Sequence, residues 1–269
     1  MEDFAQYILS EEDLASKMEI VYYLSKKTGI FFDKSVVFKT EILRLFLNYS
    51  KIDVDKNLLL TTCLLCTCKK GNNIKNLEEI HSYAKNSANY LRELGFSKRF
   101  AKICEEVNRY SNSNPRERES DILELVDQFS GMLLDRPERI GFKPDEALVL
   151  LEHRNLKNVY NRYLGTFIDF VNFIQNIKIN NKTNVTILEE LTKKCNESEN
   201  IKQFIQEVMY DYETKVDKLM AKYTNSMAEG MFCHIDPNRS LFSEGTARKI
   251  MNNIIKENME ETDTVSNNN

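Results

Sequence analysis

Apolar side chains recur every three or four residues along most of the chain, which is the period of an amphipathic α-helix. One segment, residues 55–69, is apolar nearly all round, and this is typical of a helix in the middle of a core. The pattern therefore predicts an all-α fold. The predicted helices are one that follows Ser10, one that holds Val37 and Leu47, and those over 55–69, 76–94, 97–107, 122–132, 145–152, 156–177, 185–194, 201–223 and 246–255.

Polar residues and prolines stand where these helices are expected to begin and end. Ser10, with Asp13 three residues on, predicts a capping box at the start of the first helix. Gly95 predicts a helix end and Ser97 the next start, because glycine adopts the left-handed backbone and serine caps free amides. Pro144 predicts the first turn of the helix over 145–152.

The second half of the chain has the same helical pattern with one interruption. Residues 179–184 are rich in asparagine and predict a surface connector, so we expect one domain over 1–178 and a further helical region over 179–256. The apolar stripe of 201–223 favours a place in the core. Alternatively, it could pack against a helix of a partner, including a second copy of this chain in a homodimer. Residues 257–269 have no apolar face and predict a disordered tail.

Composition narrows the class of protein. The chain has 269 residues, a formal net charge of −4 and no basic block, which argues against nucleic acid as a partner. No segment is apolar for the length that a membrane span needs, and the acidic N-terminus lacks the pattern of a secretion signal. We therefore expect a cytoplasmic protein whose six cysteines are thiols.

One stretch is specific enough to suggest a family. Residues 122–148 read ILELVDQFSGMLLDRPERIGFKPDEAL, an aspartate-bearing helix followed by an Arg-Pro-x-Arg turn and a Pro-x-Glu-Ala helix start. This resembles the C-terminal signature of the HD-GYP family, all-helical metal phosphodiesterases that cleave the bacterial second messenger cyclic-di-GMP. The resemblance spans roughly residues 37–154 and implies an HD-domain-like helical bundle.

The resemblance also implies where metal ligands would stand, and most of those positions hold other residues. The aspartate of the signature helix falls on Asp127 and is retained. The first histidine of the family falls near Lys39 and Thr40, a loose placement. The remaining positions of the degenerate metal site fall on Cys66, Thr67, Tyr83, Glu106 and Val107.

Loss of these ligands implies a protein that does not catalyse hydrolysis. A cluster of divalent ions needs several imidazole and carboxylate donors, and Asp127 alone does not supply them. We therefore expect a regulatory or scaffolding protein that binds a protein partner, with no metal or other cofactor. Two alternatives stay open: a sensor that binds a cyclic dinucleotide without cutting it, and a weak phosphodiesterase with Asp127, Glu106 and Cys66 as substituted ligands.

Positive side chains beside the implied pocket are candidates for phosphate binding. They are Lys70, Arg109, Arg136 and Arg139, since lysine and arginine bind phosphate without metal. The alternative for Arg136 and Arg139 is that they close the end of a helix and pair with Asp135 and Glu138.

The spacing of Cys63, Cys66 and Cys68 allows a metal site. However, these cysteines lie in a leucine-rich segment with no second pair nearby, so core thiols are the favoured interpretation.

Overall fold

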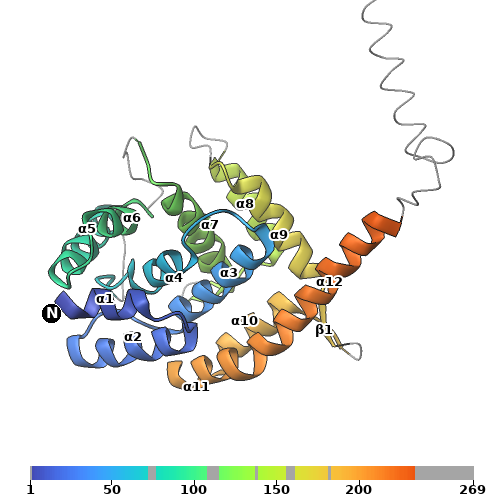
Figure 1. The fold of residues 1–269 in the computed structure, drawn as a ribbon, viewed down its shortest axis with the longest axis horizontal. Coiled ribbons are helices and arrows are strands. Elements are labelled where there is room, and N and C mark those ends of the chain that lie inside the picture. Colours follow the sequence, from blue (N-terminus) through green and yellow to red (C-terminus); the bar gives the residue numbers. More distant parts are fainter. Residues whose placement is uncertain are drawn as a thin grey trace, which may run out of the picture. The chain divides into compact units, whose positions relative to one another are not determined.

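The structure is a computed structural model of the chain, and it describes residues 2–71, 77–107, 115–136, 139–155, 161–180 and 183–233. The described part is all-α apart from one two-stranded hairpin, which confirms the predicted fold class (Figure 1). Contacts divide the chain into two compact units, residues 1–216 and 217–269, and each is described by itself.

The helices of the first unit follow one another with short connections. They are α1 (Glu2–Ser10), α2 (Leu14–Thr28), α3 (Lys34–Ser50), α4 (Lys56–Leu65), α5 (Leu77–Glu93), α6 (Lys98–Glu106), α7 (Arg118–Leu133), α8 (Pro144–Asn155), α9 (Leu164–Asn176), α10 (Ile187–Glu197) and α11 (Ile201–Gln206). The last helix, α12 (Glu213–Cys233), crosses the division between the units.

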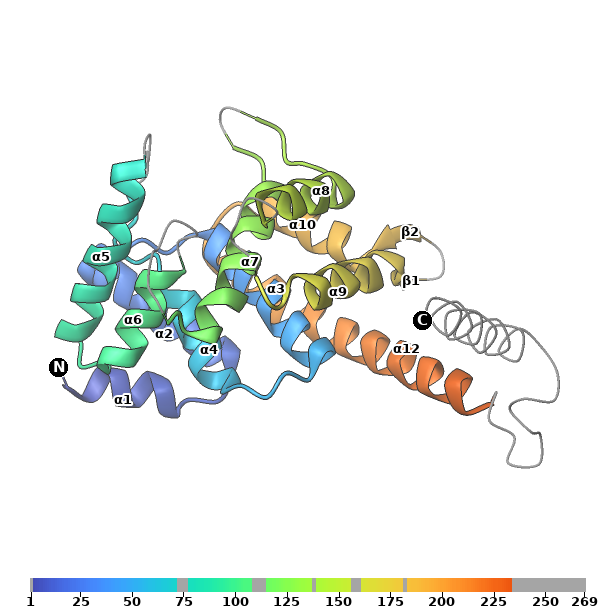
Figure 2. The ribbon, with the colours of Figure 1, turned by 90° about the horizontal axis from the view of Figure 1, so that it is seen from above.

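Helix α3 is the centre of the first unit. It contacts α4, α7, α9, α10 and α11, and its side chains are buried without a break from Val36 to Leu47 (Figure 2). A helix buried on all sides must place its polar residues inside the core as well, and those need partners there. This is why Lys39, Glu41 and Arg44 are all buried in the middle of the molecule.

The N-terminal caps follow the sequence with one correction. Ser97 accepts a hydrogen bond from the amide of Phe100, as predicted. The first predicted capping box is wrong: α1 ends at Ser10, and Asp13 itself caps α2 by accepting from the amide of Ser16 at 2.8 Å. Asp is as good an N-cap as Ser, so the spacing alone did not decide between the two starts.

Helix α4 is shorter than its apolar run. It ends at Leu65, and the next residues form tight turns in which the amides of Cys68 and Lys70 donate to the carbonyls of Leu65 and Thr67. The carbonyl of Cys68 is taken by the amide of Phe31 at 2.8 Å, in the loop before α3. The side chains after Leu65 are therefore placed by a turn rather than by a helix.

The predicted connector over 179–184 contains a β-hairpin. Strand β1 (Lys178–Asn180) pairs antiparallel with β2 (Thr183–Thr186), with Lys178 opposite Thr186. The expected boundary between 178 and 179 falls within β1, and α9 before it and α10 after it pack on α3.

The stripe over 201–223 is divided among α11, a π-helical turn over Glu207–Tyr212, and α12. Tyr212 is buried and donates from its hydroxyl to the carbonyl of Ile187 at 2.9 Å, so this part of the stripe is core. The predicted helix over 246–255 and the tail lie outside the described residues. Within those residues, no helix combines the length and the hydropathy needed to cross a membrane.

Candidate functional site

The retained aspartate is paired with a buried lysine. Asp127, on α7, accepts a hydrogen bond from the ammonium of Lys39, on α3, with an N–O distance of 3.0 Å. The side chain of Lys39 is 6% exposed, whereas that of Asp127 keeps 40% of its accessible surface. Solvent therefore reaches the carboxylate, while the ammonium is enclosed.

Two further predicted positions complete the surroundings of this ammonium. The Nζ of Lys39 lies 3.5 Å from the hydroxyl of Thr67 and 3.7 Å from the sulfur of Cys66, both of them buried in the turn after α4. Three acceptors thus face the three N–H groups of one ammonium. In the family that the sequence resembles, the positions of Asp127, Cys66 and Thr67 would hold a metal ion. In this chain their polar atoms surround the ammonium of Lys39.

The ionisation of this group follows from its surroundings. Burial alone would raise the pKa of Asp127, but the ammonium groups of Lys39 and Lys70 and the guanidinium of Arg136 hold it below its usual value. Burial alone would lower the pKa of Lys39, but the negative charges that Cys66 carries as a thiolate and Asp127 as a carboxylate raise it well above its usual value. Because burial raises the pKa of Cys66, its sulfur is a thiol at neutral pH. We therefore attribute the negative charge beside Lys39 to Asp127.

Tyr83 belongs to the same group. It comes from α5, and burial, followed by the negative charge of Asp127, raises the pKa of its phenol. The phenol therefore stays protonated at neutral pH, so that it is a hydrogen-bonding group and not a ready metal ligand.

Two of the predicted phosphate-binding residues lie near Asp127. Lys70 is partly buried, with its ammonium 5.3 Å from the centre of the Phe31 ring, and burial lowers its pKa. The carboxylate of Asp127 opposes this lowering of the pKa, and the positive charges of Lys39 and Arg136 add to it. Arg109 lies outside the described residues.

The two arginines of the Arg-Pro-x-Arg turn close the end of α7. Arg136 donates to the carbonyl of Gly131 at 3.2 Å, and Arg139 donates to the same carbonyl at 2.6 Å and to that of Met132 at 3.0 Å. Carbonyls at a helix C-terminus lack partners within the helix, so cationic side chains stabilise them. Their predicted role in binding phosphate stays a prediction.

Glycine is required in this turn for steric reasons. A Cβ atom at Gly141 would lie 1.9 Å from the carbonyl oxygen of Leu133. The turn therefore returns closely along the end of α7, and any other residue at this position would open it.

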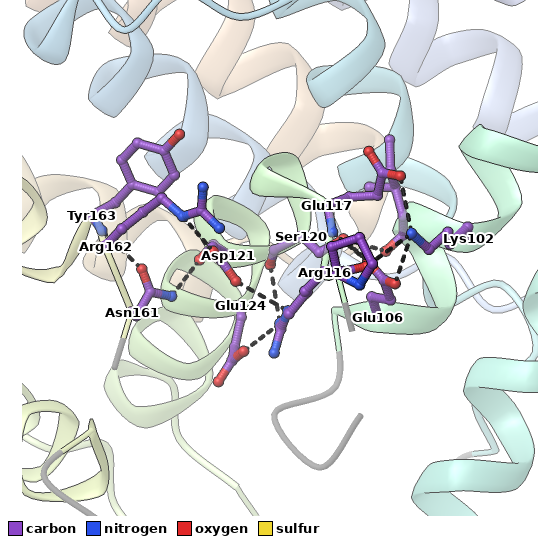
Figure 3. Close-up of polar contacts among 12 residues, drawn as sticks. Lys102, Glu106, Arg116, Glu117, Ser120, Asp121, Glu124, Asn161, Arg162 and Tyr163 are labelled. Carbon is purple, nitrogen blue, oxygen red and sulfur yellow. Dashed lines mark hydrogen bonds and ion pairs between the residues drawn. The ribbon is translucent and has the colours of Figure 1, made fainter. Parts of the chain in front are cut away.

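Glu106 and Val107, the other predicted metal-site positions, have different surroundings. Glu106 is buried, accepts from the amide of Glu117 at 2.8 Å and from Ser120 at 3.2 Å, and pairs with Lys102 at 3.5 Å (Figure 3). Val107 follows α6 and is 8% exposed. The polar contacts of Glu106 tie α6 to the start of α7.

The same face of α7 carries a second set of charges. Arg116 pairs with Asp121 at 3.0 Å and with Glu124, and Asp121 also accepts from Arg162 at 3.0 Å (Figure 3). Asn161 donates to the main-chain carbonyl of Asp121 at 2.7 Å. Side chains before α7, on it and before α9 are joined here, which indicates a structural role for this ionic cluster.

The cysteines that suggested a metal site are buried thiols. Cys63, Cys66, Cys68 and Cys104 are all buried and unpaired, and burial raises the pKa of each of them. Within the described part of the chain, no three His, Cys, Asp or Glu side chains are grouped so as to hold a metal ion. The groups around Asp127 do not fit the metal ions that the resemblance implies, because a thiol and a hydroxyl face the ammonium of Lys39 there.

Comparison with models of protein families, with curated proteins and with solved structures finds no match to this chain. The sequence pointed to Asp127, Cys66, Thr67 and Tyr83, and the structure places the first three around the ammonium of Lys39. The alignment with the family motif placed Lys39 only loosely, at the position of a histidine. The signal of its role was a lysine in a helix that is buried all round, since a buried ammonium must have partners.

Proposed function

We propose that the protein is a non-catalytic relative of the HD-GYP phosphodiesterases that works as a regulatory or scaffolding protein through contacts with other proteins. The ion pair between Lys39 and Asp127 carries this proposal. The only carboxylate retained from the implied metal site is bound by an ammonium of the chain itself.

A divalent ion would have to displace that ammonium or lie beside it. Two unit charges 4 Å apart interact by about 4 kcal/mol at an effective dielectric constant of 20, and the repulsion from a divalent ion is about twice that. Among the described residues, the remaining hydrogen-bonding partners of the enclosed ammonium are Cys66 and Thr67, and neither of them is a carboxylate. Binding of metal at Asp127 would therefore cost both this repulsion and the pairing of Lys39.

The experiment is a joint assay of metal content and hydrolysis on the purified full-length chain. We expect less than stoichiometric iron or manganese, and no turnover of cyclic-di-GMP with either ion added. Stoichiometric metal together with turnover that is lost in Asp127→Asn would contradict the proposal and would favour the weak phosphodiesterase.

The regulatory part of the proposal needs a surface for a partner. Two exposed apolar side chains support one, since Ile140, directly after the Arg-Pro-x-Arg turn, is 86% exposed and Val149, on α8, is 64% exposed. A pull-down from the native host should recover proteins that Ile140→Ser and Val149→Ser fail to recover. Equal recovery by wild type and both variants would remove this surface from the account.

A second candidate is a sensor that binds a cyclic dinucleotide without cutting it. The positive charges of Lys39, Lys70 and Arg136, which hold the pKa of Asp127 below its usual value, favour it. Calorimetric titration with cyclic-di-GMP tests it. Binding that Arg136→Ala weakens would support the sensor, and absence of binding at high micromolar ligand would remove it.

A further inference from the structure

A groove lies between the segment from the end of α7 to the start of α8 and one face of α10. It has a volume of about 280 Å³. Leu133, Phe142 and Pro144 form one wall, and Leu188 and Thr192, one helical turn apart on α10, form the other. Pockets that take small ligands have volumes of about 300–1,000 Å³, so this groove is sized for one or two side chains of another chain.

The turn that forms the first wall also exposes apolar side chains. Phe142 is 37% exposed, and Ile140, two residues before it, is 86% exposed. The amide of Phe142 donates to the carbonyl of Met132 at 2.9 Å, and the guanidinium of Arg139 lies 4.8 Å from the centre of its ring. Because these contacts already hold Phe142 in place, burying its ring under a partner would cost little conformational entropy.

The charges at the groove favour an acidic partner. Glu189, which lines it, already accepts a hydrogen bond of 2.8 Å from a main-chain amide in the capping box of α10. Asp135 accepts from the amide of Gly141 at 2.7 Å and from the side chain of Asn196, at the edge of the groove, at 3.4 Å. Among the described residues, the ammonium of Lys193, which also lines the groove, makes no hydrogen bond or ion pair. A carboxylate of another chain would therefore gain an ion pair, whereas an ammonium would compete with main-chain amides for carboxylates that are already engaged.

We propose that this groove binds an acidic peptide segment of a partner protein, with an apolar side chain between Phe142 and Leu188 and a carboxylate on the ammonium of Lys193. The inference rests on the proposed function, because it names the chemistry of the segment through which a partner is bound. Ile140 and Val149, whose variants test the proposed function, do not line the groove, so the two surfaces can be tested separately.

The test is a titration of the ¹⁵N-labelled full-length chain, at low salt, with a synthetic peptide in which two leucines stand between two pairs of glutamates. We expect saturable shifts of the amide signals of Phe142, Thr192 and Lys193. A peptide with lysines in place of the glutamates should bind about fivefold more weakly or worse, since an attraction becomes a repulsion. A peptide with serines in place of the leucines should give no saturable shift, since the apolar anchor is lost.

Variants of the chain test the two contacts one at a time. Lys193→Glu should weaken binding of the glutamate peptide about fivefold, and Lys85→Glu, which changes an exposed lysine of α5, should leave it unchanged. Phe142→Ser should weaken binding about fivefold or more, and Tyr7→Ser, which changes an exposed aromatic residue of α1, should leave it unchanged. All four side chains are exposed, so we expect each variant to fold, and its spectrum without peptide checks this.

Three results would overturn the proposal. They are no saturable shift at millimolar peptide, equal binding of the glutamate and lysine peptides, and equal binding by wild type, Lys193→Glu and Phe142→Ser. None of them bears on metal content, on hydrolysis or on the pull-down with Ile140→Ser, so the non-catalytic function would stand or fall by those measurements alone.

Discussion

The pair of Lys39 and Asp127 should stabilise the folded chain measurably. Breaking a fully buried ion pair costs about 3–5 kcal/mol, whereas an exposed pair contributes about 0–1 kcal/mol. Lys39 is 6% exposed and Asp127 40%, so this pair lies between the two limits. Lys39→Met keeps the volume of the side chain and removes its charge, and we expect it to lower the free energy of unfolding by about 1–3 kcal/mol.

A double-mutant cycle separates the pair from its surroundings. Asp127→Asn should cost about 2–4 kcal/mol, because it leaves an enclosed ammonium without its carboxylate. The double variant Lys39→Met with Asp127→Asn buries neither charge. We therefore expect it to be more stable than the sum of the single effects by about 1–3 kcal/mol. Urea unfolding of the full-length chain measures the free energy of unfolding of wild type, the two single variants and the double variant. If the two single effects add within about 0.5 kcal/mol, Lys39 and Asp127 do not stabilise the fold as a pair.

The pair also predicts a dependence on pH. The folded pKa of Asp127 lies below its usual value, so its stabilising effect is present above about pH 3.9, the value in an unfolded chain. That effect is lost as the pH falls through the folded pKa. The stability of wild type and Lys39→Met should therefore converge in acid, and a constant difference down to about pH 2 would contradict the assignment.

Other predictions concern the remainder of the molecule. Burial raises the pKa of Cys63 to about 12 and that of Cys68 to about 11, so a thiol reagent should label them only on unfolding, and fast labelling of the native chain would contradict their burial. Glu106→Gln should lower the free energy of unfolding by about 1.5–3 kcal/mol, because it weakens the contacts of this carboxylate with Glu117 and Lys102, and it should leave ligand binding unchanged. Loss of binding at unchanged stability would show instead that Glu106 contacts the ligand. Arg116→Met should cost about 3–5 kcal/mol in urea unfolding, because two buried carboxylates lose their common partner, and a cost below about 1 kcal/mol would show that they find others.

The helical period predicted most of the helices because an amphipathic helix buries one face, and α3 is the exception that is buried all round. It could not predict that α4 ends at Leu65, since its apolar run continues to Cys68 and the end is set by turns and by the loop at Phe31. Nor could it predict the hairpin, because the asparagine-rich segment fits a connector equally well. The pairing of Thr186 with Lys178 depends on contacts between residues eight positions apart, and the periodicity of a short segment carries no information about them.

The site was predictable position by position but not as a set of contacts. Counting along the motif put Cys66, Thr67, Tyr83 and Asp127 at one site, and in the structure the side chains of Cys66, Thr67 and Asp127 lie around the ammonium of Lys39. The same counting put Glu106 with them, whereas its carboxylate bonds to the start of α7. Spacing fixes where a residue stands on its helix, and the partners of a charged side chain depend on which charges it meets after packing.

In the proposed function, the ammonium of Lys39 holds the position beside Asp127 that a metal ion would need. A titration of the metal-free, full-length chain with Mn²⁺, followed by electron paramagnetic resonance of the free ion, tests it most directly. We predict that the signal of free Mn²⁺ rises in proportion to the ion added, from the first addition onward. A delay of one equivalent or more that disappears in Asp127→Asn would contradict the account.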